Sequence, residues 1–159
     1  MFIYMKKLIL LGNKNTGKTT FMNCLRQKNT RIIPTIGIYI FEYGQTKICD
    51  TSGDDIYRNI VQSCCNTMDM FVLLFRTPAD LMYIDSIRPV GKSILIYNGE
   101  DAALLDEGYL YSVKYNMKFF SCNVVNMVDS KWMWNRIFEI LHQKQVVKTH
   151  KGWRYCWFY

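Results

Sequence analysis

The sequence predicts an α/β fold, a doubly wound sheet of mostly parallel strands with helices on both faces. Two continuous apolar runs, MFVLLF at 70–75 and SILIYN at 93–98, are typical of strands that are covered on both sides. Segments with helical features stand between the expected strands, and this alternation indicates a parallel sheet. Ligands of such sheets bind outside the carboxyl ends of the strands.

The first half of the chain predicts a strand, a helix and a hairpin. KKLILLG has the composition of a buried strand that ends at Gly12, and a helix is expected over 18–28, beginning inside the loop that follows the strand. From position 36 onward isoleucines alternate with aromatic residues, and the chain then turns near Gly44. This period of two predicts a hairpin over 36–50.

A short strand and a helix are expected near the C-terminus. KFFS (118–121) is the strand candidate. The stretch 130–145 carries apolar residues at helical spacing, with Asp129 or Ser130 as the expected N-cap. This helix contains Trp132 and Trp134. We expect both to pack in the core or on the surface rather than to bind a ligand.

Composition indicates one globular domain and a tail. The chain has 159 residues, half of them hydrophobic, which is enough for a real core. We expect a domain over 1–143 and a basic, aromatic tail over 144–159. No apolar run approaches the length that crosses a bilayer. The N-terminal run is split by Lys6 and Lys7, so it makes a poor secretory signal.

The six cysteines and two histidines point away from disulfides and zinc. No cysteine pair has the C-x-x-C spacing, and Cys49 and Cys122 lie in apolar, strand-like surroundings. We therefore expect them to pack as small hydrophobic residues in a reducing compartment. Both histidines lie in the C-terminal region, and a zinc site is not expected. The expected localisation is cytoplasmic, with peripheral attachment to a membrane left open.

Residues 12–19 read GNKNTGKT and match the phosphate-binding pattern G-x-x-x-x-G-K-[ST] without a mismatch. Glycines let the backbone curl so that its N–H groups point at phosphate oxygens, and the following helix adds the positive end of its dipole. Lys18 would bridge the outer phosphates, and Thr19 would ligate Mg²⁺. The pattern does not identify the base. The nucleotide-binding residues expected here are Gly12, Asn13, Lys14, Asn15, Thr16, Gly17, Lys18, Thr19 and Thr20.

Four further motifs follow this loop in order: PTIG (34–37), DTSGDDIYRNI (50–60), NGED (98–101) and SCN (121–123). Together with the loop they resemble the small GTPases of the Ras superfamily, and the Rab branch most closely, in a divergent and shortened form. The Rab likeness comes from PTIG, from Y-R-x-I in the second motif and from SCCNTMD after it. The resemblance implies a three-layer P-loop NTPase fold, the small G domain, with a mostly parallel six-stranded sheet, one antiparallel edge strand and helices on both faces.

The resemblance implies a role for each residue of these motifs. Thr35 would place its hydroxyl on Mg²⁺, and Asp50 would hold the ion through water, so the expected metal residues are Thr19, Thr35 and Asp50. The Gly53 N–H would meet the γ-phosphate of GTP. Loss of that phosphate would release both loops, which is how such proteins switch. The expected catalytic residues are Lys18, Thr35, Gly53 and Asp54.

The last two motifs would bind the base. The Asp101 carboxylate would accept two N–H bonds from the guanine edge, Asn98 would brace the base and the loop, and the Cys122 N–H would donate to the guanine oxygen. Ser121 and Asn123 complete the expected nucleotide-binding set. An aspartate before a helix is also commonly an N-cap, and this alternative stays open for Asp101.

Two departures from the family pattern fall beside the expected γ-phosphate. Asp54 stands where the family has a glutamine that orients the attacking water. Because a carboxylate accepts hydrogen bonds but donates none, and because its charge repels the γ-phosphate, we expect slow hydrolysis of GTP. The alternative is that Asp54 faces solvent and contributes nothing. Lys14 stands where the family usually has Gly or Ser. Three interpretations of Lys14 stay open: it obstructs an arginine from an activating partner, it substitutes for that arginine, or it faces solvent.

The base pocket also lacks side chains that the family uses. Gly99 and Asn123 replace two lysines, and Arg31 is the one flat side chain between Lys28 and Pro34. We therefore expect weaker nucleotide retention and faster spontaneous exchange than in a typical relative.

Two functions are left open. The first is a guanine-nucleotide switch in membrane traffic or signalling: Mg²⁺ with GTP orders loops 30–40 and 51–65 for protein effectors or regulators, and weak GTPase activity resets it. The second is a hydrolysis-deficient GTPase-like binding module that acts as a decoy or adaptor. The tail would rest on a membrane surface or pack onto the domain or a partner. Cys156 has the prenylation position, but the residues after it suit that motif badly. Nucleic acid is not an expected partner.

Overall fold

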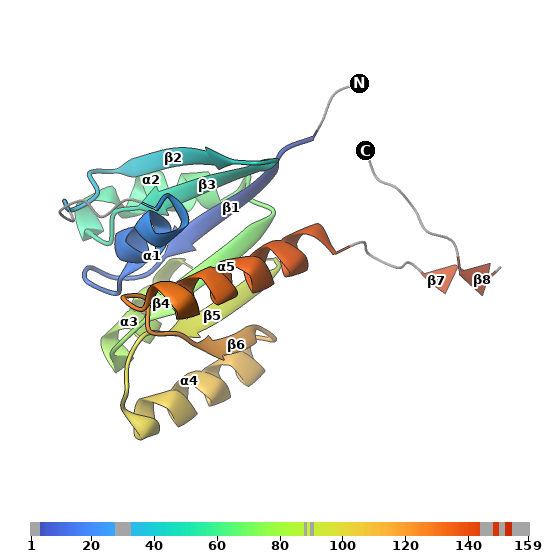
Figure 1. Cartoon of the computed structure of the whole chain (residues 1–159). Helices are drawn as coiled ribbons and strands as arrows, with labels where there is room; N and C mark the ends of the chain where they lie inside the picture. Colours follow the sequence, from blue (N-terminus) through green and yellow to red (C-terminus); the bar gives the residue numbers. More distant parts are fainter. Residues whose placement is uncertain are drawn as a thin grey trace.

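The computed structural model describes residues 4–27, 33–87, 89, 91–143, 148–149 and 152–153. Its main body is a six-stranded sheet with helices on both faces (Figure 1). The strands are β1 (Lys6–Leu11), β2 (Ile38–Tyr43), β3 (Thr46–Thr51), β4 (Met70–Phe75), β5 (Ser93–Tyr97) and β6 (Lys118–Ser121). The helices are α1 (Lys18–Leu25), α2 (Arg58–Cys65), α3 (Pro78–Ile87), α4 (Ala102–Lys114) and α5 (Met127–His142), and a 3₁₀ turn, η1 (Asp55–Tyr57), precedes α2.

Little of the predicted tail falls within this description. Two short strands, β7 (Lys148–Thr149) and β8 (Gly152–Trp153), pair in antiparallel fashion. The other residues of the tail expected over 144–159, Cys156 among them, lie outside the described residues, as do Lys28 and Arg31. In the part of the chain that the structure describes, no helix combines the length and apolar character needed to cross a membrane.

The sheet confirms the predicted fold class. Its strand order is β2-β3-β1-β4-β5-β6. β1 runs parallel to β3 and β4, and β5 runs parallel to β4 and β6. β2 alone pairs in antiparallel fashion, with β3 at one edge. The carboxyl ends of the parallel strands therefore meet at one end of the sheet, where the loops that follow them come together.

Two apolar cores, one on each face of the sheet, explain the continuous apolar strands. In β1, Leu8 and Leu10 belong to the core under α1 and α5, whereas Ile9 and Leu11 belong to the core under α2, α3 and α4. Successive side chains of a strand point to opposite faces, so a strand with helices on both sides needs apolar residues at every position. β4 is buried along its whole length for the same reason.

Two helix boundaries differ from the prediction. The helix expected over 18–28 ends at Leu25, because Gln27 adopts the left-handed conformation with φ 53° and the chain turns there. The helix expected over 130–145 spans Met127–His142, and the capping prediction was wrong. Asn126 is the N-cap, its side chain accepting the N–H groups of Val128 and Asp129.

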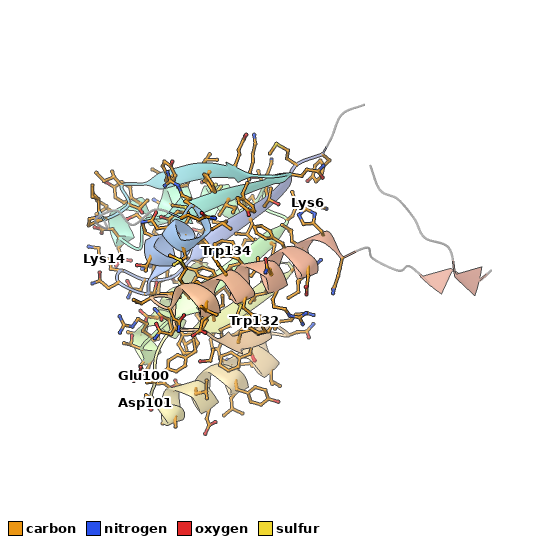
Figure 2. The ribbon with its side chains drawn as sticks, in the orientation of Figure 1. Lys6, Lys14, Glu100, Asp101, Trp132 and Trp134 are labelled. Carbon is orange, nitrogen blue, oxygen red and sulfur yellow. The ribbon has the colours of Figure 1, made fainter. Side chains whose placement is uncertain are left out.

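The two tryptophans of α5 have different environments (Figure 2). Trp134 is only 1% exposed and stacks on Phe21 of α1, with ring centroids 4.5 Å apart. Its indole N–H donates to the Phe21 carbonyl oxygen at 2.9 Å, so one side chain joins α5 to the helix that follows the phosphate loop. Trp132 is 54% exposed and meets Phe120 edge-on. Both tryptophans thus pack, one in the core and one on the surface.

We expect Trp134→Ala to lower the free energy of unfolding by about 3–5 kcal/mol, because it leaves a cavity and removes the bond to Phe21. The matched control is Trp132→Ala in the same helix, which should cost less than about 1 kcal/mol because that side chain is largely exposed. Urea unfolding followed by far-UV circular dichroism measures both. Equal losses in the two variants would contradict the assignment of Trp134 to the core.

Candidate nucleotide-binding site

The loop between β1 and α1 is shaped by close contacts at its two glycines. Gly12 and Gly17 have positive φ angles of 153° and 99°. A Cβ at Gly12 would collide with the Leu74 carbonyl oxygen of β4, and one at Gly17 would lie 2.7 Å from the side chains of Asn98 and Val124. No other residue type satisfies both the backbone angle and the space, so the loop is held against its neighbours.

Lys18 is the buried cation of this loop. The residue is 6% exposed, and its Nζ donates to the carbonyl oxygens of Gly12 at 2.8 Å and Asn13 at 2.7 Å. Burial lowers the pKa of Lys18 to about 8. The charges of Asp50 and Asp80 oppose this effect only in part, and an anion bound in the loop would add further counter-charge.

Three oxygen-bearing side chains from different segments meet beside Lys18. The Thr19 and Thr35 hydroxyls donate to Asp50 Oδ2 at 2.8 and 2.9 Å and lie 2.9 Å from each other. Asp50 is fully buried, and burial raises its pKa, whereas the hydrogen bonds from the two hydroxyls act in the opposite direction. Its Oδ1 has no hydrogen-bond partner among the described residues. Mg²⁺ takes oxygen ligands and usually keeps several waters beside one or two carboxylates. The chemistry of this oxygen cluster, two hydroxyls beside a buried carboxylate with an unpartnered oxygen, therefore fits Mg²⁺.

The phosphate loop and the two threonines of the oxygen cluster, Thr19 and Thr35, border one cavity of about 670 Å³, whereas Asp50 is not among its lining residues. This volume is in the usual range for a small-molecule or cofactor site. Several lining residues were not singled out from the sequence. Ile36, Ile56 and Tyr57 lie inside the quoted motifs but were given no role of their own. Val124 and Val125 directly follow the SCN motif, and Arg76 directly follows β4 at the carboxyl end of the sheet.

Asn98 connects the phosphate loop to the segment after β6. Its side-chain N–H donates to the Thr16 carbonyl oxygen at 2.9 Å, and its Oδ1 accepts the Val124 N–H at 3.2 Å. The bracing of the loop that the resemblance assigns to this asparagine is thus present. Asn98 also borders the cavity.

Asp101 is the N-cap of α4. Its Oδ1 accepts the N–H groups of Ala103 and Leu104 at 2.8 and 3.3 Å. Its own N–H donates to the Tyr97 hydroxyl at 2.8 Å. Figure 2 shows Asp101 beside Glu100 at the start of this helix. Asp101 therefore acts as the helix N-cap that the sequence left open as an alternative. It is not among the residues that line the cavity.

Tyr97 explains the glycine at position 99. A Cβ on Gly99 would lie 2.5 Å from the Tyr97 hydroxyl oxygen, so the tyrosine occupies the space that the lysine of the resembled pattern would need. Tyr97 is buried, and its ring packs on Phe75. The loop 98–101 is thus organised around a tyrosine hydroxyl.

The three residues of the SCN motif also make internal contacts. Ser121 ends β6, and the Cys122 N–H donates to the Tyr97 carbonyl oxygen at 2.9 Å. The N–H that the resemblance assigns to the guanine oxygen is thus engaged within the protein. Asn123 Oδ1 accepts the Val125 N–H at 3.1 Å. Cys49 and Cys122 are both buried, as their apolar surroundings predicted.

Lys14 and Asp54, which both line the cavity, form an ion pair with each other. Lys14 Nζ lies 2.7 Å from Asp54 Oδ2, the two side chains being 60% and 31% exposed, and the hydrogen bond from Lys14 lowers the pKa of Asp54. Next to the pair, Gly53 lies directly on the phosphate loop, where a Cβ would collide with the peptide between Asn13 and Lys14. Sequence reasoning treated Lys14 and Asp54 separately and missed this pairing.

The fold and the site define a class. A mostly parallel six-stranded sheet with one antiparallel edge strand, and a glycine-bounded loop around a buried lysine between β1 and α1, are the features of the P-loop small G-domain fold.

The comparisons with known proteins agree with this class. Over 176 aligned positions the chain is 22% identical to the Ras-related protein Rab-3 of Caenorhabditis elegans, a match that covers 94% of this chain and 80% of that protein. No family model matches the sequence. The similarity is distant, and it supports a relationship to the small GTPases of the Ras superfamily.

Two variants of Asp101 separate helix capping from guanine recognition. Asp101→Ala should lower the free energy of unfolding by about 1 kcal/mol, whereas Asp101→Asn should leave it nearly unchanged because asparagine caps as well as aspartate. If the carboxylate also binds guanine, both variants lose affinity for GDP, since an amide cannot accept both guanine N–H groups. Urea unfolding and calorimetry with GDP provide the two measurements. Full GDP affinity in Asp101→Asn would restrict this residue to capping.

Proposed function

We propose that the protein is a guanine-nucleotide switch that binds Mg²⁺ with GTP or GDP and hydrolyses GTP slowly. The observation that carries the proposal is the oxygen cluster, in which Thr35 is tied to Thr19 and Asp50 beside the buried Lys18. The cluster joins the segment 33–37 to the phosphate loop and to the end of β3. The position of that segment is therefore coupled to whatever occupies the site.

The chain's own residues have distinct tasks in this proposal. Backbone N–H groups of the phosphate loop and the Lys18 ammonium bind the outer phosphates. Thr19, Thr35 and Asp50 hold Mg²⁺, which neutralises phosphate charge when bound. Gly53, packed on the phosphate loop, offers its N–H to the last phosphate. Both loops thereby respond to the presence of that phosphate.

Asp54 supports slow hydrolysis. A carboxylate accepts hydrogen bonds but cannot also donate one, so it is less able than an amide to orient an attacking water between two partners. Its Oδ2 is also engaged by Lys14. We propose weak GTPase activity on these grounds.

The two loops of the site carry an exposed apolar surface for protein partners. Isoleucines on the segments 33–40 and 51–60 point outward rather than into the two cores: Ile33, Ile36, Ile40, Ile56 and Ile60. We propose that effectors or regulators read the loops 30–40 and 51–65 through this surface; residues 30–32 lie outside the described part of the chain. A cytoplasmic location, contact of the tail with a membrane and a role in membrane traffic or signalling extend the same proposal.

A second candidate is a module that binds nucleotide without turnover and serves as a decoy or adaptor. The Lys14–Asp54 pair favours it, because the pair fastens the 51–57 loop to the phosphate loop within the protein itself. A loop held in this way depends less on the last phosphate for its position.

Nucleotide content and turnover distinguish the two candidates. We expect chromatography of the denatured protein to release GTP or GDP, and loaded GTP to yield phosphate slowly in a single turnover. Lys18→Ala should lower nucleotide affinity by more than about a hundredfold, because it removes the buried ammonium from the phosphates. Lys47→Ala, on the surface of β3, is the control and should bind as the wild type does. Bound GTP that never turns over would favour the adaptor, and absence of binding to either nucleotide would contradict both candidates.

Nucleotide release should be fast. Gly99 offers no stem to cover the purine, and each lost contact of about 1 kcal/mol weakens retention several-fold. We expect a fluorescent GDP analogue to leave in much less than hours with Mg²⁺ present and without an exchange factor, and faster still after chelation of Mg²⁺ by EDTA. Release that takes many hours in Mg²⁺ would show that other contacts hold the base.

A further inference from the structure

The ion pair between Lys14 and Asp54 lies in the wall of the proposed nucleotide cavity. Both residues border the cavity together with Lys18 and Gly53. They come from two different loops and bring one positive and one negative charge to the same place, with their charged atoms 2.7 Å apart. Figure 2 shows Lys14 on the loop that precedes α1.

Local hydrogen bonds position both partners. The Lys14 N–H donates to the side chain of Asn13 at 2.8 Å. The Asp54 N–H donates to the Ser52 hydroxyl at 3.2 Å, and the Asp54 side chain accepts the Ile56 N–H at 3.4 Å. Because the backbones on both sides are fixed in this way, the pair has a defined place beside the cavity.

The two charges of the pair affect how strongly the site binds a nucleotide with a third phosphate. Lys18 binds the outer phosphates of a nucleotide in this kind of loop, so a third phosphate adds negative charge to the end of the cavity that Lys14 and Asp54 border. Lys14 attracts that charge and Asp54 repels it. With the pair intact the two effects largely offset each other.

We propose that the Lys14–Asp54 pair sets the preference of the site between nucleoside triphosphate and diphosphate, with Lys14 as the attracting group and Asp54 as the group that restrains it. This inference rests on the proposed function and deepens it. It gives the two unusual residues one shared role, and it makes Asp54 a specificity-determining residue.

The two single substitutions are expected to act in opposite directions. Asp54→Asn releases Lys14 and removes a repulsive charge, so it should raise the ratio of triphosphate to diphosphate affinity about three- to tenfold. Lys14→Gln leaves Asp54 unopposed and should lower the same ratio by a similar factor of about three to ten. The double variant should return close to the wild-type ratio. Calorimetry with GDP and a non-hydrolysable GTP analogue, at low salt with Mg²⁺, measures the ratio.

The surface pair Lys47–Glu42 provides matched controls. It joins β3 to β2 at 3.3 Å. Lys47→Gln and Glu42→Gln make the same changes in net charge and should leave the ratio unchanged. Asp54→Glu, which keeps the charge, should also stay near the wild type. Thermal unfolding shows whether each variant is still folded. Lys14→Gln changes a mostly exposed side chain, so this variant tests the proposal even if a variant of Asp54 is less stable.

Opposite shifts that shrink as salt rises to about 1 M would support the proposal, because salt screens exposed charges. Shifts in the same direction, or shifts no larger than those of the Lys47 and Glu42 variants, would overturn it while leaving nucleotide binding intact. A wild-type protein that binds neither nucleotide would overturn the proposed function itself, and the two failures are therefore distinguishable.

Discussion

The packing of the phosphate loop against its neighbours is the constraint on which the rest of the site depends. At Gly12 the loop touches the end of β4, at Gly17 it touches Asn98 and Val124, and from the other side Gly53 presses on it. These contacts leave no room for a side chain at the three glycines. They fix the carbonyl oxygens that hold the Lys18 ammonium, so the buried cation is a consequence of backbone packing at the carboxyl end of the sheet.

Three of the departures from the family pattern, at Lys14, Asp54 and Gly99, have a structural partner beside them. Lys14 and Asp54 are each unusual alone, but they form an ion pair with each other. Tyr97 and Gly99 are related in the same way, because the tyrosine hydroxyl fills the space above the glycine and holds the loop through the Asp101 N–H. In each pair the polar or charged group of one residue has a partner within the protein, so the departure leaves no group of the pair unpaired.

The fold was predictable from local patterns, whereas part of the site was not. The apolar runs of β4 and β5 identified strands because helices cover both faces of the sheet, and the period of two identified the β2–β3 hairpin. The start of α5 was misplaced because its cap, Asn126, precedes the apolar periodicity. The resemblance placed Lys14 and Asp54 beside the same expected phosphate, but it did not predict that their side chains form an ion pair, because neither residue belongs to the family pattern.

The residues at the two ends of the proposed nucleotide site make different contacts. This difference determines which part of a bound nucleotide could change the position of the loops. At the phosphate end, the segments around Thr35 and Gly53 meet the phosphate loop through shared hydrogen bonds and close backbone contact. At the base end, the polar groups of Asp101 and Cys122 are engaged in capping α4 and in pairing with Tyr97. Among the described residues, these contacts link the phosphate end, and not the base end, to the loops that carry the exposed isoleucines. In the proposed function, a change in phosphate number would therefore act directly on the position of these loops, whereas the base would serve to identify and retain the ligand.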